Sequence, residues 1–407
     1  MKNFLSICIA ILCVFSVQAQ QTREEQKAMA LHRKIFTIDS HTDTPLRLTR
    51  AGFDFFADNS ENSWSRVDYP RMKDGQLDAV FFAAFTGQGP LSPDGRTKAY
   101  NDALKICDSV ESLCRNNPNK LNLCLTSAQA LENHKKNIIS IFLGMENAYP
   151  LGTDTSLLRF FYQKGIRYVT VCHTKNNDLC DSSTDTLLHD GLSDTGRLMI
   201  DQMNQLGIMV DVSHLSDKSF YDIIDMSKAP VIASHSCARA ICDSPRNMYD
   251  EMLISLAANG GVIQLCILSD YVKSIKQSAE RDTAMVLLWR KYVDWDKMTP
   301  EQYKSYWVDR QEIDKKHPRQ LATISDAVDH IDHIVKTIGI NHVGIGTDFD
   351  GGGGLADCKD SSELWRITLE LIRRGYSKED IAKIWGGNFL CVMREVEMVA
   401  FTLNNAN

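Results

Sequence analysis

The chain has 407 residues, of which 43% are hydrophobic and 24% are charged, which is the composition of an ordinary globular protein. This length allows two or three average domains, or one large β/α barrel with insertions. The formal net charge of -7, without a basic patch, argues against nucleic acid as the main partner.

The first nineteen residues have the pattern of an export signal. A positively charged start is followed by an apolar run at residues 4–17 and by a small-residue cleavage site at Ala19. The run is shorter than a membrane span, which needs ~20 residues; the alternatives are a membrane anchor or a lipoprotein at Cys13. We therefore expect residues 1–19 to be a cleaved signal peptide, residues 20–407 to form a single domain, and the protein to be periplasmic or secreted.

Short runs rich in β-branched and aromatic residues predict eight strands. Most of the runs are almost continuously apolar rather than alternating, which is typical of parallel strands that are covered on both faces. The predicted strands occupy residues 35–39, 77–85, 138–145, 168–173, 208–214, 230–235, 261–267 and 342–348.

Helical patterns separate most of these strands. Residues 194–206 begin with Asp194 as an N-cap candidate and stop before Gly207. Similar stops end the predicted helices at 156–164, 325–338 and 361–374. This alternation of strand and helix predicts an α/β fold with eight units, a (β/α)8 TIM-like barrel. The alternative is an open doubly wound sheet, but the segment after the first strand lacks a glycine-rich phosphate turn.

Two stretches interrupt the alternation. Residues 51–70 form a polar and aromatic connection after the first strand, and residues 269–324 form a long insertion after the seventh. The insertion is rich in aromatic and charged residues. Because it follows a strand, it is placed at the carboxyl-terminal face of the barrel, where active sites lie. We expect it to lie over the site.

Metal-type ligands close most of the predicted strands. The carboxyl ends of the strands converge on one face of a barrel, so these side chains are expected to meet. A single His after a strand is usually an ordinary core or surface residue, but burying imidazoles and carboxylates together without a metal ion would be costly. The residues are His41, Asp43, Glu146, His173, His214, His235 and Asp348.

Five of these seven residues, three His, one Asp and one Glu, would form a ligand set. That set has too many members for one tetrahedral zinc with an open position. Five ligands suit two ions that share a carboxylate. Nitrogen and oxygen ligands without a thiolate favour zinc, with manganese, cobalt or iron as alternatives. Two metals ~3.5–4 Å apart can hold a bridging hydroxide and polarise a carbonyl. We therefore expect two Zn²⁺ ions per chain.

Seven motifs resemble those of a known family, in the same order. They are Ile38-Asp39-Ser40-His41-Thr42-Asp43, Gly144-Met145-Glu146, Thr170-Val171-Cys172-His173, Asp211-Val212-Ser213-His214, Ser234-His235-Ser236, Ser244-Pro245-Arg246-Asn247 and Gly346-Thr347-Asp348-Phe349-Asp350-Gly351. Over roughly residues 35–395 the chain resembles the membrane (renal-type) dipeptidases, a branch of the amidohydrolase superfamily. The first strand carries no His-x-His pair, which disfavours the deaminase and phosphotriesterase branches.

The resemblance implies a metal-binding role for five positions. His41 and Asp43 would bind one zinc ion, and Glu146, which we also count among the catalytic groups, would bridge to the second. His214 and His235 would complete the second ion's ligands.

The same resemblance implies roles in substrate binding and catalysis. His173 would hydrogen-bond the scissile carbonyl or the oxyanion. Asp348 would relay a proton from the bridging water to the leaving amine. Arg246 would hold the terminal carboxylate of the substrate, which the guanidinium geometry suits. Tyr271 would line the site.

The function implied by the resemblance is hydrolysis of dipeptides with a free terminal carboxylate, by a metal-bridging hydroxide. The alternatives are a deacylase of N-acyl (D-)amino acids with the same binuclear site, and a non-catalytic zinc-binding protein. Dipeptides are the expected partners, with no nucleic acid and no transmembrane segment in the mature chain. A homodimer is compatible with the sequence. Unlike the family's animal members, the chain has no hydrophobic tail after Ala400 that would signal a glycolipid anchor.

Three other patterns have ordinary interpretations. His330 and His333 are expected on the surface or in the packing of a helix. Residues 351–354 lack the Lys and Ser/Thr of a phosphate loop, so a flexible turn beside the site is expected. Ten of the twelve cysteines lie after residue 19 and could form disulfides in an exported protein, although Cys172 and Cys266 lie in apolar runs typical of buried thiols.

Overall fold

A parallel β-sheet that closes almost completely into a barrel forms the centre of the computed structural model, which describes residues 22–50, 52–60, 65–293 and 298–405. The expected signal peptide at residues 1–19 lies outside the described residues, as does part of the 51–70 connection. Among the described residues, no helix has the length and apolar character needed to cross a membrane.

Eight strands follow one another around the ring, in chain order and with every neighbouring pair parallel. They are β1 (Ile38–Thr42), β2 (Ala79–Phe85), β4 (Ile139–Glu146), β5 (Ile166–Thr170), β6 (Met209–Asp211), β7 (Ile232–Ser236), β8 (Val262–Leu265) and β9 (Val343–Ile345). A short ninth strand that the sequence did not predict, β3 (Leu121–Leu123), pairs only with β4.

The first and last strands complete the ring at one point. A single bridge joins Thr42 to Phe349. The N–H of Asp43 donates to the carbonyl of Phe349 at 2.9 Å, and the N–H of Asp348 donates to the carbonyl of His41 at 3.0 Å. This near closure confirms the (β/α)8 TIM-like barrel and excludes the open doubly wound sheet. It also places the residues that follow β1 and β9 side by side.

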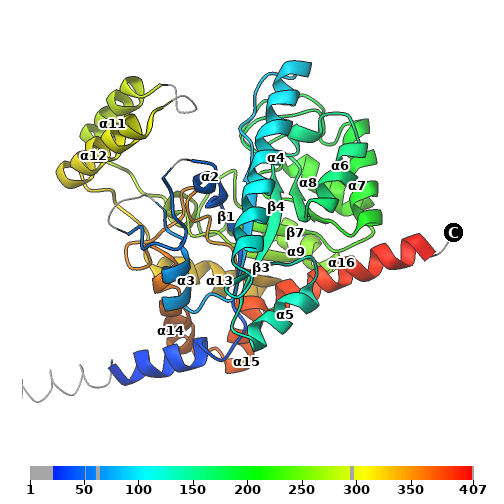
Figure 1. The fold of residues 1–407 in the computed structure, drawn as a ribbon. Coiled ribbons are helices and arrows are strands. Elements are labelled where there is room, and N and C mark those ends of the chain that lie inside the picture. The colour runs from blue at the N-terminus through cyan, green and yellow to red at the C-terminus, as the bar shows by residue number, and fades with distance from the viewer. Residues whose placement is uncertain (1–21, 51, 61–64, 294–297, 406–407) are drawn as a thin grey trace, which may run out of the picture.

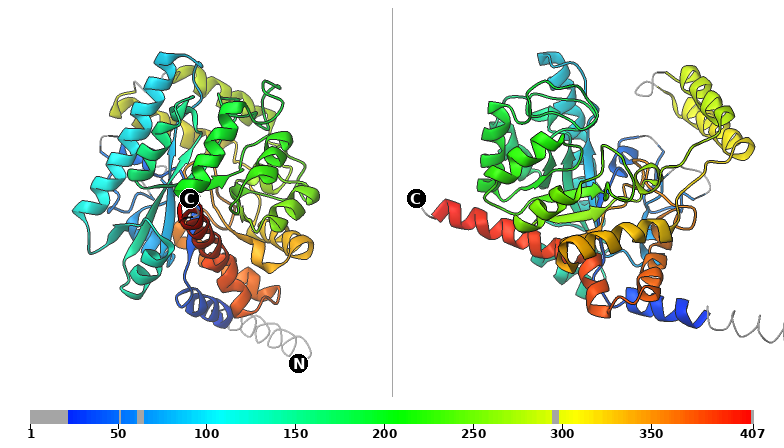
Figure 2. Two further views of the ribbon diagram at one scale, coloured as in Figure 1. Left: turned by 90° about the vertical axis from the view of Figure 1, so that its right-hand side faces the viewer. Right: turned by 180° about the vertical axis from the view of Figure 1, so that it is seen from behind.

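Helices surround the ring (Figures 1 and 2), and outward-facing strand residues such as Val80 and Phe82 pack in the core between the two layers. One helix spans residues 22–32. The others outside the insertion are α2 (Pro45–Leu48), α3 (Tyr69–Asp74), α4 (Pro93–Asn116), α5 (Ser127–Lys135), η1 (Tyr149–Leu151), α6 (Ser156–Gln163), α7 (Asp194–Leu206), α8 (Asp217–Met226), α9 (Asp250–Ala258), α13 (Ile324–Ile338), η3 (Ile340–His342), η4 (Ser361–Glu363), α14 (Trp365–Arg373), α15 (Lys378–Ala382), η5 (Lys383–Gly387) and α16 (Asn388–Asn405).

Helix α7 begins and ends at the capping residues that its sequence indicates. The hydroxyl of Ser193 accepts the N–H of Gly196 at 3.0 Å, so Ser193 is the N-cap and Asp194 is the first helical residue. Gly207 follows the last turn with φ +78°, a left-handed conformation that glycine adopts at little cost. The predicted helix at 194–206 is thus confirmed, with its cap one residue earlier than expected.

Aromatic side chains fill the interior of the barrel below the site. Phe81 stacks on Phe142 with ring centroids 4.8 Å apart and on Tyr168 at 5.0 Å. Phe389, from the first turn of α16, meets Phe81 edge-on at 5.3 Å. Because residues alternate along a strand, Glu146 lies on the same face of β4 as Phe142. The packing therefore aims Glu146 into the barrel.

The insertion leaves the barrel as α10 (Ser269–Val272), α11 (Ala279–Lys291) and α12 (Pro300–Lys316). The last two helices form a hairpin that stands away from the barrel (Figure 2, right). At its base, the side-chain amide of Gln277 donates to the carbonyl of Gln320 at 3.0 Å and accepts the N–H of Gln320 at 3.1 Å. The hairpin has a small apolar core of its own, formed by Met285, Leu288, Tyr292 and Tyr306.

Candidate metal centre

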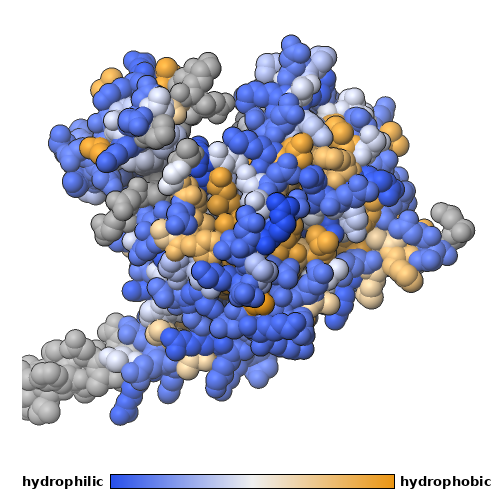
Figure 3. Space-filling model, in the orientation of Figure 1, coloured by the Kyte–Doolittle hydropathy of each residue, from blue (hydrophilic) through white to orange (hydrophobic). Residues whose placement is uncertain are grey.

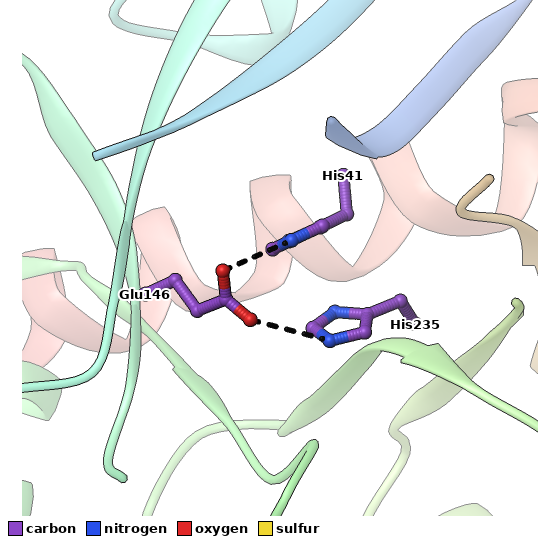
Figure 4. A group of neighbouring side chains, drawn as sticks. All are labelled: His41, Glu146 and His235. Carbon is purple, nitrogen blue, oxygen red and sulfur yellow. Dashed lines mark ion pairs between the residues drawn. The ribbon is translucent and has the colours of Figure 1, made fainter. Parts of the chain in front are cut away.

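Glu146, the last residue of β4, lies at the centre of a cluster of histidines, of which Figure 4 shows His41 and His235. Its Oε2 is 3.4 Å from Nε2 of His41. Its Oε1 is 3.2 Å from Nε2 of His214, 3.5 Å from Nε2 of His235 and 3.6 Å from Nε2 of His173. The imidazoles come from β1, from β7 and from the segments after β5 and β6. They meet because a barrel brings the carboxyl ends of its strands together.

All seven residues that the strand ends singled out take part in this cluster. Their ligand-type atoms form three overlapping groups, each within 4.8 Å: His41 with Glu146 and His235, Glu146 with His173 and His214, and His41 with Asp43 and Asp348. The ring of His214 is 4.2 Å from that of His173 and 4.9 Å from that of His235, centroid to centroid. The roles of the individual residues stay predictions.

Irregular backbone aims several of these side chains. The pairing of β1 with β2 shifts register where His41 lies, and the pairing of β7 with β8 shifts where His235 lies. Such irregularities redirect side chains beside active sites. His214 and Asp348 have φ of +73° and +58°. Non-glycine residues adopt a positive φ uncommonly, and such positions cluster at functional sites.

A buried carboxylate on β6 braces the strand that carries His235. Asp211 accepts the hydroxyl of Thr170 at 2.5 Å, and it accepts both the N–H and the hydroxyl of Ser234, at 2.8 and 2.6 Å. The hydroxyl of Ser234 is in turn 2.8 Å from Nδ1 of His235. Because Ser234 donates to Asp211, it accepts from Nδ1, which leaves the Nε2 lone pair of His235 directed into the cluster.

His41 is held in a similar way. Its Nδ1 is 2.8 Å from the hydroxyl of Tyr168, a member of the aromatic core. Asp39 accepts the backbone N–H of His41 at 3.2 Å and that of Thr347 at 2.8 Å, which ties β1 to the segment after β9. These supporting residues were not predicted from the sequence. The signal that could have found Asp39 and Asp211 is a carboxylate within an otherwise apolar strand.

Unsatisfied atoms show that the cluster fits cations. Nε2 of His41, Oδ1 of Asp43 and Nδ1 of His214 are buried and have no hydrogen-bond partner among the described residues. Nε2 of His214 also faces Nε2 of His235 at 2.9 Å. A buried polar atom without a partner costs ~1–3 kcal/mol. Imidazole nitrogens and carboxylate oxygens around one shared carboxylate form a donor set suited to divalent metal ions.

The buried groups also compete for protons. Burial raises the pKa of Asp348 to about 7, against the opposing effect of His41. Burial lowers the pKa of His41, but the negative charges of Glu146, Asp43 and Asp348 outweigh it and raise this pKa to about 10. Burial holds the pKa of His214 and His235 well below the usual range. Bound divalent cations would offset the negative charge of the buried carboxylates, which protons offset here.

Arg246 lies beside the cluster as a buried cation. Its side chain is 5% exposed, donates to the carbonyl of His235 at 3.3 Å, and lies 5.3 Å from the ring centroid of Tyr271. Its Nε has no hydrogen-bond partner, and no acidic side chain of the described residues forms an ion pair with it. A buried charge that no ion pair offsets is costly, so this position is suited to an incoming anion.

The remaining motifs have structural roles. His330 is buried in packing, where its Nδ1 accepts the N–H of Ala238 at 3.1 Å. Residues 351–354 form a turn against the site; a Cβ at Gly351 would lie 2.0 Å from Asp43 and 2.2 Å from Asp348, so glycine is needed there. His333 pairs with Asp250 at 2.7 Å.

The ten described cysteines are unpaired, and all but Cys391 are buried. Cys172 and Cys266 are completely buried, as their apolar surroundings in the sequence indicated. The thiol of Cys266 is 3.9 Å from Oδ2 of Asp348.

Comparison with known proteins identifies related sequences along almost the whole chain. Residues 25–407 match the family described as membrane dipeptidase (peptidase family M19). Dipeptidase tcpJ of Claviceps purpurea is 30% identical over 372 residues, which cover 89% of this chain and 77% of the relative. Dipeptidase 3 of Rattus norvegicus is 29% identical over 385 residues, covering 93% and 68%.

Solved structures agree with the sequence comparison. The structure of the probable dipeptidase PvdM from Pseudomonas aeruginosa has a TM-score of 0.80 and 29% identity, and the match covers 93% of this chain and 99% of that one. A metallo peptidase described as dipeptidase AC has a TM-score of 0.71 and 25% identity, and the match covers 89% and 98%.

Proposed function

The chain belongs to the membrane dipeptidase family, peptidase family M19, and on this premise we propose that it is a zinc-dependent dipeptidase acting on dipeptides with a free terminal carboxylate. The observation that carries the proposal is the buried carboxylate of Glu146, which lies within 3.6 Å of four imidazole nitrogens. We further propose export of residues 20–407 as one catalytic domain, on the basis of the pattern of residues 1–19.

Five residues would hold two metal ions. We assign His41 and Asp43 to one ion, His214 and His235 to the other, and Glu146 to both. The unpartnered Nε2 of His41 and Oδ1 of Asp43 support this assignment, as does the approach of His214 Nε2 to Oε1 of Glu146 at 3.2 Å. When bound, two zinc ions supply a Lewis acid for the scissile carbonyl and lower the pKa of a water molecule, which makes it a nucleophile at neutral pH.

The other polar residues of the cluster act on the substrate. His173, whose Nε2 lies 3.6 Å from Oε1 of Glu146, would donate a hydrogen bond to the carbonyl oxygen of the scissile bond. Asp348 lies beside His41 and Asp43, where it can accept a proton from the attacking water and deliver it to the leaving amine. Arg246, with Tyr271 beside it, would bind the terminal carboxylate.

A substrate panel tests this proposal and separates it from its alternatives. Ala-Ala, the amide of Ala-Ala and N-acetylalanine would be incubated with zinc-replete protein, with and without a chelator. We expect rapid hydrolysis of Ala-Ala, slow hydrolysis of the other two, and loss of activity with the chelator. Preferred hydrolysis of N-acetylalanine would identify a deacylase instead. Bound zinc without hydrolysis of any substrate would identify a binding protein.

Replacement of Arg246 tests how the carboxylate is recognised. A buried charge-assisted hydrogen bond contributes ~1.5–3 kcal/mol, so Arg246→Ala should lower kcat/KM for Ala-Ala by roughly 10- to 100-fold. The amide of Ala-Ala, which lacks the carboxylate, should be affected much less. Arg246→Lys should be intermediate, because lysine keeps the charge and loses the planar fork. If parent enzyme cleaves the free and amidated dipeptides equally well, Arg246 does not have this role.

A further inference from the structure

Arg246, the proposed site for the terminal carboxylate of the substrate, lies in a loop at residues 237–248, which we call the Arg246 loop. The guanidinium of Arg239 donates to the carbonyl of Pro245 at 3.0 Å and to that of Asn247 at 2.8 Å. These two residues flank Arg246 in the chain, so its backbone is fixed within the loop on both sides. The position of Arg246 therefore depends on how the loop is attached to its surroundings.

Tyr271, whose ring centroid lies 5.3 Å from Cζ of Arg246, comes from a different element. It belongs to α10, where the insertion leaves the barrel. Figure 3 shows a hollow between the barrel and the α11–α12 hairpin that follows α10. A helix of four residues is too short to be stable by itself. Bonds to the barrel are therefore needed to hold Tyr271 beside Arg246.

Asn247 makes the first connection between the Arg246 loop and α10. Its side chain is 1% exposed, and its amide group donates to the carbonyl of Tyr271 and to that of Cys242, both at 2.8 Å. One bond thus reaches α10, and the other stays within the loop. Because Asn247 directly follows Arg246, it links the backbones of the two residues that would contact the carboxylate.

His330, on helix α13, makes the second connection. It is completely buried; its Nδ1 accepts the N–H of Ala238 at 3.1 Å, and its Nε2 lies 2.8 Å from the carbonyl of Val272. Because a backbone N–H can only donate, the ring proton lies on Nε2 and is donated to Val272. One nitrogen thus holds the Arg246 loop, and the other holds α10. Helix α13 packs in the main core through Ile331, so both segments are fixed to one buried element.

We infer that His330 and Asn247 are positioning residues, which join the Arg246 loop to α10 so that Arg246 and Tyr271 form one preassembled site for the terminal carboxylate. This inference rests on the proposed function. Both residues act through Arg246 and Tyr271 rather than on the substrate itself. Preassembly lowers the cost of ordering side chains when a ligand binds. Loss of either connection therefore weakens binding of the carboxylate more than it slows the chemical step.

Replacement of His330 by leucine removes both of its bonds and keeps a side chain of similar size. With the full-length, zinc-replete enzyme, His330→Leu should raise KM for Ala-Ala roughly 10-fold and change kcat little, because the ground state and the transition state lose the same contact. The amide of Ala-Ala lacks the carboxylate and should be affected much less. Asn247→Leu, which removes the other connection, should act in the same direction.

Two conservative variants should restore part of the binding. The amide oxygen in His330→Asn can accept the N–H of Ala238, and the amide N–H in His330→Gln can reach the carbonyl of Val272. Each variant should have a KM between that of the parent enzyme and that of His330→Leu. They also provide the comparison if His330→Leu does not fold.

His32 provides a matched control outside the site. It is also completely buried, and its ring nitrogens bond to the hydroxyl of Thr368 at 2.7 Å and to the carbonyl of Gly75 at 3.0 Å. His32→Leu should lower the thermal stability, as His330→Leu does, and leave KM for Ala-Ala unchanged. An equal increase of KM in both variants would attribute the effect to stability and would overturn the inference.

A double substitution separates positioning from a general effect on the fold. If His330 acts through Arg246, Arg246→Ala with His330→Leu should have nearly the same kcat/KM as Arg246→Ala alone. Additive effects, or a parental KM for Ala-Ala in both His330→Leu and Asn247→Leu, would overturn the inference and leave the proposed function intact. Failure of the parent enzyme to hydrolyse Ala-Ala would overturn both.

Discussion

Glu146 and Asp348 are both buried carboxylates, but their neighbours differ. Glu146 contacts four imidazoles, of which we assign three to metal ions and one, His173, to the substrate. Asp348 groups only with His41 and Asp43, and its Oδ2 also lies near the Cys266 thiol. Removing the charge of Glu146 should therefore disturb the metal site, whereas removing the charge of Asp348 should disturb proton transfer.

Two substitutions that preserve size test this difference. Asp348→Asn should retain two zinc ions and lower turnover by roughly 10²–10⁴-fold, the usual contribution of a positioned acid or base. Glu146→Gln should lower both turnover and zinc occupancy, because it removes the shared ligand. Elemental analysis and Ala-Ala turnover would be measured for both variants in parallel. Our assignment is wrong if Asp348→Asn loses metal as readily as Glu146→Gln, or if it retains nearly normal turnover.

Tyr168 connects the aromatic core to the site through its hydroxyl, 2.8 Å from Nδ1 of His41. Tyr168→Phe keeps the packing and removes this bond, so zinc affinity should fall by about 10- to 100-fold, as for other groups that orient a metal ligand. Zinc binding would be measured by competition with a chelator. Tyr149→Phe is a matched control, because that buried hydroxyl bonds to the carbonyl of Pro90 instead. Equal zinc affinity in all three proteins would contradict this role.

The sequence predicted the members of the cluster but not how they are aimed. Polar ligands at the ends of apolar strands are conspicuous, and a barrel makes such ends converge. The register shifts at His41 and His235 have no sequence signature. Ser40, next to His41, bonds inward to the carbonyl of Ser234 at 2.7 Å, and in a regular strand His41 would then point the opposite way.

At the level of elements, all eight strands of the ring lie where the sequence predicted strands, with shifted ends. The strand predicted at 168–173 is β5 at Ile166–Thr170, and the strand predicted at 342–348 is β9 at Val343–Ile345. The apolar runs continue past the strands because the segments after them remain buried under the loops. Three-residue β3 was missed because so short a run carries no periodicity.

The α11–α12 hairpin can be removed with little expected damage to the barrel, since its apolar core is separate. Gln277 and Gln320 are bonded at its base, so a short glycine-serine link can replace residues 278–319. The shortened protein should keep a cooperative thermal unfolding transition and hydrolyse tripeptides faster relative to Ala-Ala, because one wall of the site is gone. Unchanged kinetics on both substrates would show that the hairpin does not limit substrate length.

Across the whole molecule, the proposed metal ligands come from β1, β4, β7 and the segments after β1 and β6, and so connect opposite sides of the ring. The sequence could predict this architecture because strand and helix alternate so regularly along it. It could not predict the way the ring closes, since the Thr42–Phe349 bridge joins residues 307 positions apart and depends on the curvature of the complete sheet. Export remains a prediction from residues 1–19.

We claim that dipeptide hydrolysis requires two metal ions that share Glu146 as a ligand. A zinc titration tests this claim most directly. Protein stripped with a chelator would receive zinc in steps, with bound zinc and Ala-Ala turnover measured at each step. The five assigned ligands predict no turnover without zinc and maximal turnover at two ions per chain, as for other two-metal hydrolytic sites. Full turnover at one bound ion, or undiminished turnover in the stripped protein, would contradict the account.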